Sequence, residues 1–457
     1  MAAERWQNFS PGDLSVALPE VVAGDVPAAI VAATDAAAMW ARTPLAERIE
    51  RMRAAQQALA AAKDELARGI ALETGKPLTE ALGEVGAVIA KIDLTIGDAE
   101  EHLTERTILG GPHPAVVRQS ARGPAVVIGP FNFPLHLGHG ANVAHLLAGN
   151  PVIFKPSPLA ATVAARYVDL FAPHFPPGVF QLVQGGGAEG EALCLDPRVR
   201  AICFTGSVPV GRALALKLAG DFAKDVALEL GGSNALIVCA DADLGAAAQA
   251  AADGACLTSG QRCNATTRVI VERSVAAAFE HKFLDALAGY EPGDPRLPAT
   301  KLGPVISAAA VARYEKLLGE LRGDWLLAGQ VEPVVAGKRG HYVRPAVIRR
   351  EGDGATDAEC FVPLVSFFVA DDLDHAARLQ SATPFGLTAS LFTRSEDTFR
   401  RLGAELEVGN LYANLPTTFS PSTLPFGGWR ESGNGRPGGR GFIRFTTREQ
   451  AVQWTGF

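Results

Sequence analysis

Between Ala125 and Val238, short runs of β-branched and aromatic residues alternate with Ala- and Leu-rich segments that are long enough to be helices. The runs are AVVIG, PVIFK, VFQLV, AICFT and NALIV, and segments 160–170 and 208–219 are helical in character. This alternation predicts parallel strands joined by helices, which form a doubly wound sheet. Such sheets bind dinucleotides beyond the carboxyl ends of their strands, so chemistry is expected in the turns after these runs.

Helical and α/β patterns extend over the rest of the chain. Apolar residues recur at helical spacing within 25–73 and 78–103. Helix-like segments at 244–257, 274–287 and 308–321 alternate with the apolar runs VIVER, LVSFFVA and ASLFT. They predict a second α/β unit, because 457 residues exceed what one hydrophobic core organises. The tail after Gly439 alternates polar and apolar residues and predicts an exposed strand that could pair with another subunit.

Charge and cysteine usage narrow the functional classes. The net charge of -7, from 49 acidic and 42 basic residues, disfavours a nucleic-acid partner, so a small molecule is expected instead. Six cysteines without CxxC pairing and nine histidines without metal-site spacing predict no metal and a reducing cytoplasm. The N-terminus lacks the pattern of a secretory signal. The most apolar stretch, 124–154, is interrupted by Pro, Asn and His, which favours a buried sheet over a membrane span.

Cys263 lies in the segment TSGQRCN. The Gly-Gln pair before it allows a close backbone approach, and Arg262 could favour the reactive thiolate form. A lone cysteine is more often inert packing, because only thiolate character and exposure make it a nucleophile. The assignment therefore depends on the groups around it.

Two upstream residues supply groups that a cysteine nucleophile needs. Glu229 ends an apolar run 34 residues before Cys263. Burial at that strand end would raise its pKa toward the range of a general base, and a capping or salt-bridged glutamate is the alternative. Asn132, in IGPFNFP, lies on a turn made rigid by prolines, from which its amide could donate to a developing oxyanion.

Thr205, Gly206 and Ser207 follow an apolar run and open a helix that contains Gly211. A strand, a turn and a helix in this order bring backbone N–H groups and a helix N-terminus to a phosphate. The glycine spacing alone is weak evidence, and the order of the elements strengthens it. A phosphate-containing ligand is therefore expected at this turn.

These segments stand in the order and approximate spacing of a known family. GPFNFP, VIFKPSP, FTGSVPVG, LELGGSN, GQRC, ECFVP, PFGL and LPFGGWRESGNG, with ALETGKP near the start, resemble the motifs of the NAD(P)-dependent aldehyde dehydrogenase superfamily. The resemblance implies an α/β fold with a Rossmann-type dinucleotide-binding domain (1–103 and 118–230), an α/β catalytic domain (231–438) and a small β oligomerisation element (104–117 and 439–457). It also implies a homodimer or a dimer of dimers.

The resemblance assigns roles to residues. Cys263 would form a thiohemiacetal with the aldehyde and then a thioester, and Glu229 would activate the water that hydrolyses it. Asn132 and the backbone N–H of Cys263 would form the oxyanion site. The residues implied to bind the cofactor are Lys155, Ser157, Thr205, Gly206, Ser207, Gly211, Glu359 and Phe361, the last two at the nicotinamide ribose and ring.

Three positions depart from the family pattern. Val362 stands where the usual ExFGP motif has glycine, which could shift how Glu359 reaches the ribose. Pro158 stands where many NAD-preferring members have a glutamate that bonds the adenosine ribose, so a 2′-phosphate is not obviously excluded. Ser381 replaces a frequent asparagine, and nothing in the sequence explains it. NAD is therefore the expected cofactor, with NADP as the alternative.

Among subfamilies, the chain most resembles the succinylglutamate semialdehyde dehydrogenases of arginine degradation, through GPFNFPLHLGHGANVAHLLAGN, SGQRCNATTRVIV and segment 422–437. Pro158, Val362 and Phe131, where that subfamily usually has tyrosine, depart from it, so another semialdehyde or an aliphatic aldehyde stays open. A carboxylated substrate needs guanidinium or hydroxyl donors. The candidates are Arg262, Thr417, Thr418, Ser420 and Ser422, which could equally cap turns or pack structurally.

Other functions stay open at this point. A CoA-acylating dehydrogenase or an acyl-phosphate reductase shares the nucleophile but usually lacks the glutamate, so Glu229 argues against both. A catalytically silent member typically loses the cysteine or the base, and Cys263 and Glu229 are both present. His136 and His139 follow the Asn132 turn three residues apart, and we expect a buried, hydrogen-bonded role for them rather than catalysis.

Overall fold

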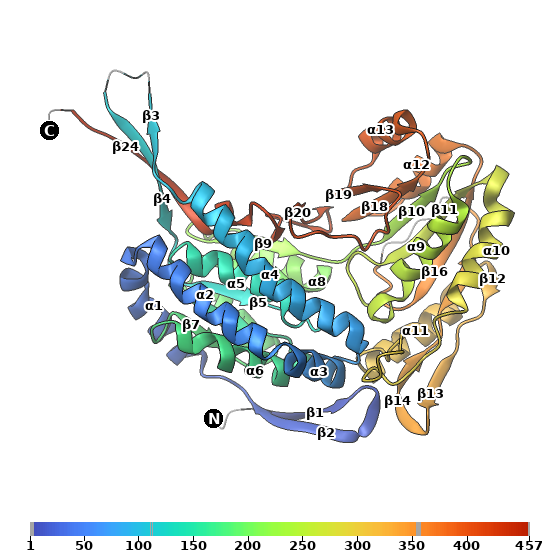
Figure 1. Ribbon diagram of the computed structural model, residues 1–457, viewed down its shortest axis with the longest axis horizontal. Coiled ribbons are helices and arrows are strands. Elements are labelled where there is room, and N and C mark those ends of the chain that lie inside the picture. The colour runs from blue at the N-terminus through green and yellow to red at the C-terminus, as the bar shows by residue number, and fades with distance from the viewer. Residues whose placement is uncertain (1–3, 110, 112, 353–357, 456–457) are drawn as a thin grey trace.

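The computed structural model describes residues 4–109, 111, 113–352 and 358–455, which form two α/β lobes and a projecting β arm (Figure 1). The first lobe contains a six-stranded sheet in the order β22-β9-β8-β5-β6-β7. Its strands are β5 (Ala125–Ile128), β6 (Val152–Lys155), β7 (Phe180–Leu182), β8 (Ala201–Thr205), β9 (Asp225–Glu229) and β22 (Gly433–Asn434). Strands β5 to β9 are parallel, and β22 is antiparallel to β9. The strand order reverses beside β5, where sheets of this kind bind ligands.

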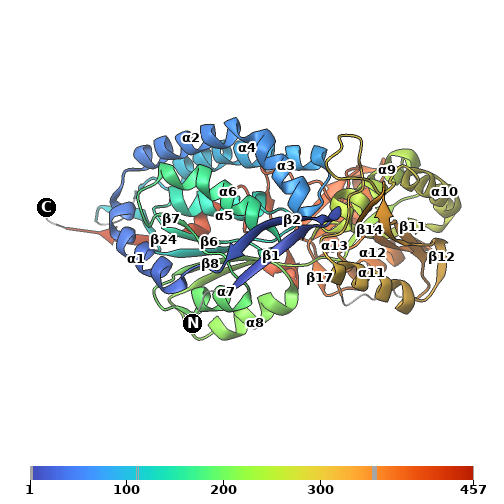
Figure 2. The ribbon, with the colours of Figure 1, turned by 90° about the horizontal axis from the view of Figure 1, so that it is seen from below.

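Helices cover both faces of this sheet, and the strands are therefore apolar on both sides. One face carries α2 (Leu45–Ala61), α4 (Leu78–His102), α5 (His136–Leu147) and α6 (Ala161–Phe171), and the other carries α1 (Val26–Arg42), α7 (Gly187–Leu195) and α8 (Val208–Leu218) (Figure 2). Helix α3 (Lys63–Thr74) precedes α4. Along β5, Val127 packs toward the first group and Val126 toward the second. The helices predicted at 160–170 and 208–219 are confirmed as α6 and α8.

The second lobe is built on a seven-stranded sheet in the order β12-β15-β16-β11-β10-β18-β19. Its strands are β10 (Asn234–Val238), β11 (Thr266–Glu272), β12 (Asp324–Leu327), β15 (Ala346–Arg349), β16 (Leu364–Ala370), β18 (Thr388–Phe392) and β19 (Asn410–Ala413). Only the β12–β15 pair among these is antiparallel. The run NALIV, grouped above with the first sheet, is β10 of this one. That expectation was wrong, because apolar periodicity does not specify which strand lies alongside.

Helices also sandwich the second sheet. The helices α9 (Leu244–Cys256) and α10 (Ala276–Leu287) cover one face, and α12 (Leu373–Ser381) and α13 (Glu396–Glu405) cover the other. Helix α11 (Ala308–Glu320) packs near the edge formed by β15 and β16. The predicted helices 244–257, 274–287 and 308–321 are confirmed within two residues at each end.

Two hairpins connect the lobes at their lower edge (Figure 1). They are β1 (Arg5–Ser10) with β2 (Asp13–Val22), and β13 (Val331–Val335) with β14 (Lys338–Val343). The Tyr342 hydroxyl donates to Gly12 O at 2.9 Å, and His341 N donates to Pro11 O at 2.8 Å. The first hairpin also contacts the first lobe, because Asn8 Nδ2 donates to Pro158 O at 2.7 Å.

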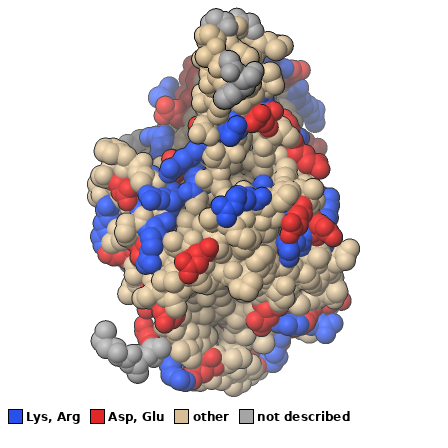
Figure 3. Space-filling model, turned by 90° about the vertical axis from the view of Figure 1, so that its left-hand side faces the viewer, with Lys and Arg blue, Asp and Glu red and all other residues tan. Residues whose placement is uncertain are grey.

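The arm is a three-stranded antiparallel sheet of β3 (Arg106–Ile108), β4 (Ala115–Ala121) and β24 (Thr447–Gln453). Figure 3 shows basic and acidic side chains interspersed on the face that carries it. The predicted tail strand begins only at Thr447. Its first part, Phe442–Thr446, is a 3₁₀ helix, because Phe442 and Ile443 are buried in the core of the first lobe.

Short pairings complete the sheet structure. They join β17 (Phe385–Gly386) to β21 (Trp429–Arg430) and β20 (Pro425–Phe426) to β23 (Gly438–Gly439). Among the described residues, no helix combines the length and the apolarity needed to cross a bilayer.

Candidate active site

A cavity of about 710 Å³ is lined by residues of both lobes. It lies beyond the carboxyl ends of β5, β6, β8 and β9, the place that the strand order marks for a ligand. The sequence-predicted residues that line it are Asn132, Lys155, Ser157, Thr205, Gly206, Ser207, Glu229, Cys263, Glu359 and Phe361. Gly211 and the five candidate substrate residues are not part of its lining. Gly211 lies against Leu230, which leaves no room for a side chain there.

The backbone ahead of Cys263 is held in an uncommon conformation. Thr258 and Ser259 have φ values of 53° and 56°, a left-handed region that costs about 1–3 kcal/mol for such residues. The Ser259 hydroxyl donates to Gly303 O at 2.8 Å, and Asn234 Nδ2 donates to Cys263 O at 2.8 Å. Bonds on both sides of the cysteine therefore fix where its sulfur lies.

Glu229 and Cys263 line the same cavity, and each affects the ionisation of the other. Burial raises the pKa of the Glu229 carboxyl to about 8. The neighbouring Cys263 thiol opposes part of this rise, and the negative charge of Glu359 adds to it. Glu229 Oε1 is buried without a hydrogen-bond partner. Burial, followed by the neighbouring Glu229, also raises the pKa of the Cys263 thiol. Glu229 therefore becomes a proton acceptor as the pH rises through about 8, beside a thiol that stays neutral, and its Oε1 is free for a further ligand.

Arg262 does not act on the thiol as we expected. Its Nη2 forms an ion pair with Glu80 at 2.6 Å, and its Nε donates to Thr258 Oγ1 at 3.0 Å. The pKa of Cys263 is raised, not lowered. The expectation that Arg262 favours the thiolate was therefore wrong, because its charge is already matched by Glu80.

Asn132 is 3 % exposed and lines the cavity from the turn between β5 and α5. Its neighbour Phe131 packs edge-to-face against Phe361 of the other lobe, with ring centroids 5.9 Å apart. The turn that carries Asn132, the predicted amide donor, is thus in contact with Phe361, the predicted contact to the nicotinamide ring. This contact aligns the two lobes at the site.

One end of the cavity offers cations to an anionic ligand. Lys155 is buried, and its Nζ donates to Pro156 O at 3.3 Å, while burial lowers its pKa to about 8. Ser157 and Pro158 line the same region, so the position noted for a ribose-binding glutamate carries no carboxylate. Lys217, also on the lining, forms an ion pair with Glu191 at 2.5 Å.

The turn between β8 and α8 also borders the cavity. Thr205, Gly206 and Ser207 line it, and Ser207 precedes the first residue of α8 without a side-chain cap. The N-terminus of this 11-residue helix therefore presents backbone N–H groups toward the cavity, an arrangement that suits a phosphate. Lys155, Ser157 and this turn together fit the adenosine and pyrophosphate portions of a dinucleotide.

Glu359 and Phe361 form the opposite wall. The Glu359 carboxyl accepts from Gly232 N at 3.2 Å, and burial raises its pKa to about 7. Its oxygen lies 2.7 Å from where a Cβ on Gly231 would be, so a side chain at Gly231 would displace the Glu359 carboxyl. Val362, the residue that departs from the family pattern, is buried in the core around Tyr314 and not in the cavity wall.

The candidate substrate residues lie in other surroundings. Thr417 is fully buried and its hydroxyl donates to Asn264 O at 2.8 Å. Thr418 is buried, Ser422 is half-buried and Ser420 is exposed. The prediction that these residues bind substrate stays a prediction. The contacts of Thr417 support the other expectation, that this residue packs structurally.

The two histidines after the Asn132 turn are neutral. His139 is fully buried, its Nδ1 bonds the Tyr167 hydroxyl at 2.8 Å, and burial lowers its pKa to about 3. Burial lowers the pKa of His136 to about 4. A hydrogen-bonded role is thus confirmed for His139.

Arg313 of α11 also lines the cavity, and the sequence did not point to it. Its positive charge acts to lower the pKa of Glu359. In the sequence, Arg313 is marked only by its position in a predicted helix. That position does not indicate a contact with Glu359, which lies 46 residues further along the chain.

Comparisons with known proteins agree with this geometry. The model of the aldehyde dehydrogenase family matches residues 6–452. N-succinylglutamate 5-semialdehyde dehydrogenase 1 of Caulobacter vibrioides is 37 % identical over 423 residues, which cover 91 % of this chain and 88 % of that protein. N-succinylglutamate 5-semialdehyde dehydrogenase of Cronobacter sakazakii is 36 % identical over 438 residues, covering 94 % and 86 %.

Solved structures are similar over the whole chain. A putative aldehyde dehydrogenase from Burkholderia cenocepacia superposes with a TM-score of 0.93 at 30 % identity and covers 99 % of this chain and 94 % of that one. An indole-3-acetaldehyde dehydrogenase in complex with NAD+ gives a TM-score of 0.94 at 28 % identity, with coverages of 99 % and 94 %. The family model and these relatives extend over both lobes and the site, and the chain belongs to the aldehyde dehydrogenase family.

Proposed function

We propose that this aldehyde dehydrogenase oxidises a carboxylated semialdehyde, such as N-succinylglutamate semialdehyde, to the carboxylic acid through a thioester on Cys263. The observation that carries the proposal is the cavity whose lining brings together Cys263, the buried carboxyl of Glu229 and Asn132. A nucleophile, a base and an amide donor in one enclosed space are what acyl chemistry on an aldehyde requires.

In the first step, the Glu229 carboxylate takes the thiol proton and Cys263 Sγ bonds to the aldehyde carbon. The carbonyl π bond breaks, and its electron pair moves onto the oxygen. The Asn132 amide and the Cys263 backbone N–H donate to that oxyanion. A bound nicotinamide dinucleotide supplies the hydride acceptor that converts the resulting thiohemiacetal to a thioester.

In the second step, Glu229 acts on water. It first releases the thiol proton to solvent, and its ionised carboxylate then removes a proton from a water molecule as the water oxygen attacks the thioester carbon. The C–S bond then breaks, the carboxylic acid leaves, and Cys263 takes up a proton. The unpartnered Glu229 Oε1 provides an acceptor for that water.

For the cofactor, we propose NAD, with NADP also accepted. Lys155 and Ser157 would hold the adenosine ribose, and the turn at Thr205 would hold the pyrophosphate. Position 158 carries a proline, so this side chain has no carboxylate that would repel a 2′-phosphate. Glu359 would accept from the nicotinamide ribose hydroxyls.

For the substrate, the names of the relatives support a succinylated semialdehyde. Arg262 lies beside the nucleophile and is the cation that we propose to bind a substrate carboxylate. Because Thr258 and Glu80 engage its Nε and Nη2, it would do so through Nη1. Thr418, Ser420 and Ser422 stay weaker candidates.

We also propose that the arm pairs subunits into a homodimer or a dimer of dimers, and that the enzyme is cytoplasmic. The support is that β24 is an edge strand of the arm and that Leu109 beside β3 is 88 % exposed. The six cysteines are free thiols, which suits a reducing compartment. Light scattering on the full chain and on Val452→Pro, which blocks strand pairing, would test the assembly. An unchanged mass would refute the role of β24.

The test of the function supplies NAD or NADP with a panel of semialdehydes and aliphatic aldehydes, without CoA, and follows the absorbance of the reduced cofactor. We expect turnover with the carboxylated semialdehydes. Turnover only when CoA is added would instead support a CoA-acylating enzyme. A folded chain that turns over none of the panel would refute an oxidising function.

A further inference from the structure

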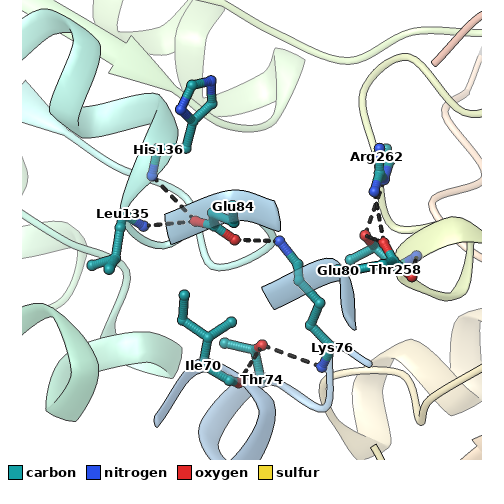
Figure 4. A network of polar contacts seen from close by, with 9 residues as sticks. All are labelled: Ile70, Thr74, Lys76, Glu80, Glu84, Leu135, His136, Thr258 and Arg262. Carbon is teal, nitrogen blue, oxygen red and sulfur yellow. Dashed lines mark hydrogen bonds and ion pairs between the residues drawn. The ribbon is translucent and has the colours of Figure 1, made fainter. Parts of the chain in front are cut away.

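A buried pair of opposite charges lies behind the Asn132 turn (Figure 4). Glu84 of α4 and Lys76, which precedes that helix, form an ion pair in which both side chains are fully buried. The other Glu84 oxygen, Oε1, accepts from the backbone N–H groups of Leu135 and His136, each at 3.1 Å. These two N–H groups stand at the start of α5, directly after the turn that carries Asn132.

The same cluster reaches the nucleophile loop. The ring of Phe133 contacts two cations, with Lys76 Nζ 3.7 Å and the Arg262 guanidinium carbon 4.9 Å from its centroid. Arg262 in turn bonds Glu80, one helical turn before Glu84 on α4. One face of α4 therefore holds both the start of α5, which follows the Asn132 turn, and the residue before Cys263.

Stability alone does not account for such a pair. Removing two charges from water costs several kcal/mol per ion, and apolar side chains of the same volume are often at least as stabilising. Burial lowers the pKa of Lys76, and the charge of Glu84 opposes that shift. A buried ion pair with fixed hydrogen bonds holds the groups bonded to it in one defined position.

We propose that Glu84 and Lys76 are positioning residues for thioester formation, which hold the Asn132 amide at the place where the oxyanion on Cys263 develops. The inference rests on the proposed function, because it takes Cys263 as the nucleophile. Neither residue contacts the reacting atoms. They act through the start of α5 and through the Phe133 ring.

The chain offers a matched control. Glu73 of α3 is also a buried carboxylate, 3 % exposed, and it accepts from Thr162 N at 2.9 Å and Val163 N at 2.7 Å at the start of α6. Its chemistry matches that of Glu84, but α6 does not follow the Asn132 turn. Glu84→Ala and Glu84→Gln are therefore compared with Glu73→Ala and Glu73→Gln in the full chain.

The readouts are the single-turnover rate of cofactor reduction with enzyme in excess, the KM for the cofactor and the thermal midpoint. Glu84→Ala should lower the single-turnover rate about 10- to 100-fold, as misplacement of an active group by about 1 Å does. The KM for the cofactor should change little. Glu84→Gln, which keeps an acceptor oxygen, should recover part of the rate, and the Glu73 variants should lose thermal stability while keeping a rate near wild type.

A single-turnover rate of Glu84→Ala near wild type would overturn the inference, and so would an equal loss in Glu73→Ala. If Glu84→Ala does not fold, the Lys76→Met/Glu84→Leu double variant, which removes both charges and the acceptor oxygens together, carries the same expectation. A wild-type chain with no cofactor reduction would refute the proposed function and this inference with it. If the wild-type chain reduces the cofactor and Glu84→Ala does so at the same rate, only the positioning role is refuted.

Discussion

Glu229, the last residue of β9 in the first lobe, and Cys263 of the second lobe line the same cavity. Neither lobe alone therefore holds a complete reacting pair. Burial raises the pKa of both groups, so the carboxyl and the thiol are both mostly protonated near neutral pH. The predictions below follow from this relationship and from the cavity around it.

Replacing Cys263 with Ala should abolish aldehyde oxidation, because no sulfur remains to form the thioester. The cofactor contacts at Lys155 and Glu359 stay in place, so binding of NAD measured by fluorescence or calorimetry should persist. Cys360→Ala is the control, since that thiol is not part of the cavity lining. Residual oxidation by Cys263→Ala would refute the nucleophile assignment.

The Glu229→Gln variant should stall after the hydride step, because the amide cannot take a proton from water. We expect a burst of reduced cofactor equal to the enzyme concentration, followed by turnover that is about 100-fold slower or more. Mass spectrometry should find the acyl adduct on the peptide that contains Cys263. Steady-state rates near wild type would show that another group is the base.

The pH dependence of kcat should follow the ionisation of Glu229. Burial raises the pKa of this carboxyl to about 8, so the carboxylate that acts as base is scarce below that pH and abundant above it. Activity should therefore rise as pH increases through about 8. Glu359→Gln removes a neighbouring negative charge and should move the midpoint to lower pH. A plateau that is already complete in mildly acidic buffer would contradict this assignment.

The Pro158→Glu variant should separate the two nicotinamide cofactors. A carboxylate near the adenosine ribose would repel a 2′-phosphate, so kcat/KM with NADP should fall about 10-fold or more relative to NAD, since like charges in contact cost several kcal/mol. Pro158→Gln controls for loss of the proline. Equal effects of both variants on the NADP/NAD ratio would mean that charge at this position does not select the cofactor.

Replacing Arg262 with Lys should weaken binding of a carboxylated semialdehyde, because the planar donor pattern is lost. We expect the KM for that substrate to rise about 10-fold, and the KM for an aliphatic aldehyde of similar length to change little. If both KM values rise together, Arg262 serves only to hold the nucleophile loop through Glu80.

The sequence predicted the parts of the fold that repeat along the chain and the site residues that lie in ordered motifs. Strands such as β5 and β8 are apolar on both faces because helices cover both, and this leaves a clear signal. Nothing in the run NALIV itself indicates which strands β10 pairs with. The 3₁₀ helix at Phe442–Thr446 was missed because its mixture of polar and apolar residues continues the alternation of the tail, which is typical of a strand.

The cluster behind the Asn132 turn could not be predicted for a similar reason. Glu84 lies 51 residues from Leu135 in the chain, and Glu80 lies 182 residues from Arg262. Each is an ordinary charged residue in a helical pattern, which suggests a solvated surface. Only the packing of α4 against both loops makes them neighbours.

The crossing between the lobes at Glu229 is short. Glu229 is the last residue of β9 and Asn234 is the first residue of β10, so only residues 230–233 join the two sheets at this point. Because this connection is so short, even a small rotation of one lobe against the other moves the Glu229 carboxyl away from the sulfur of Cys263. Mild heat or denaturant should therefore inactivate the enzyme before it loses helix content, and catalysis becomes a sensitive gauge of how the lobes are aligned.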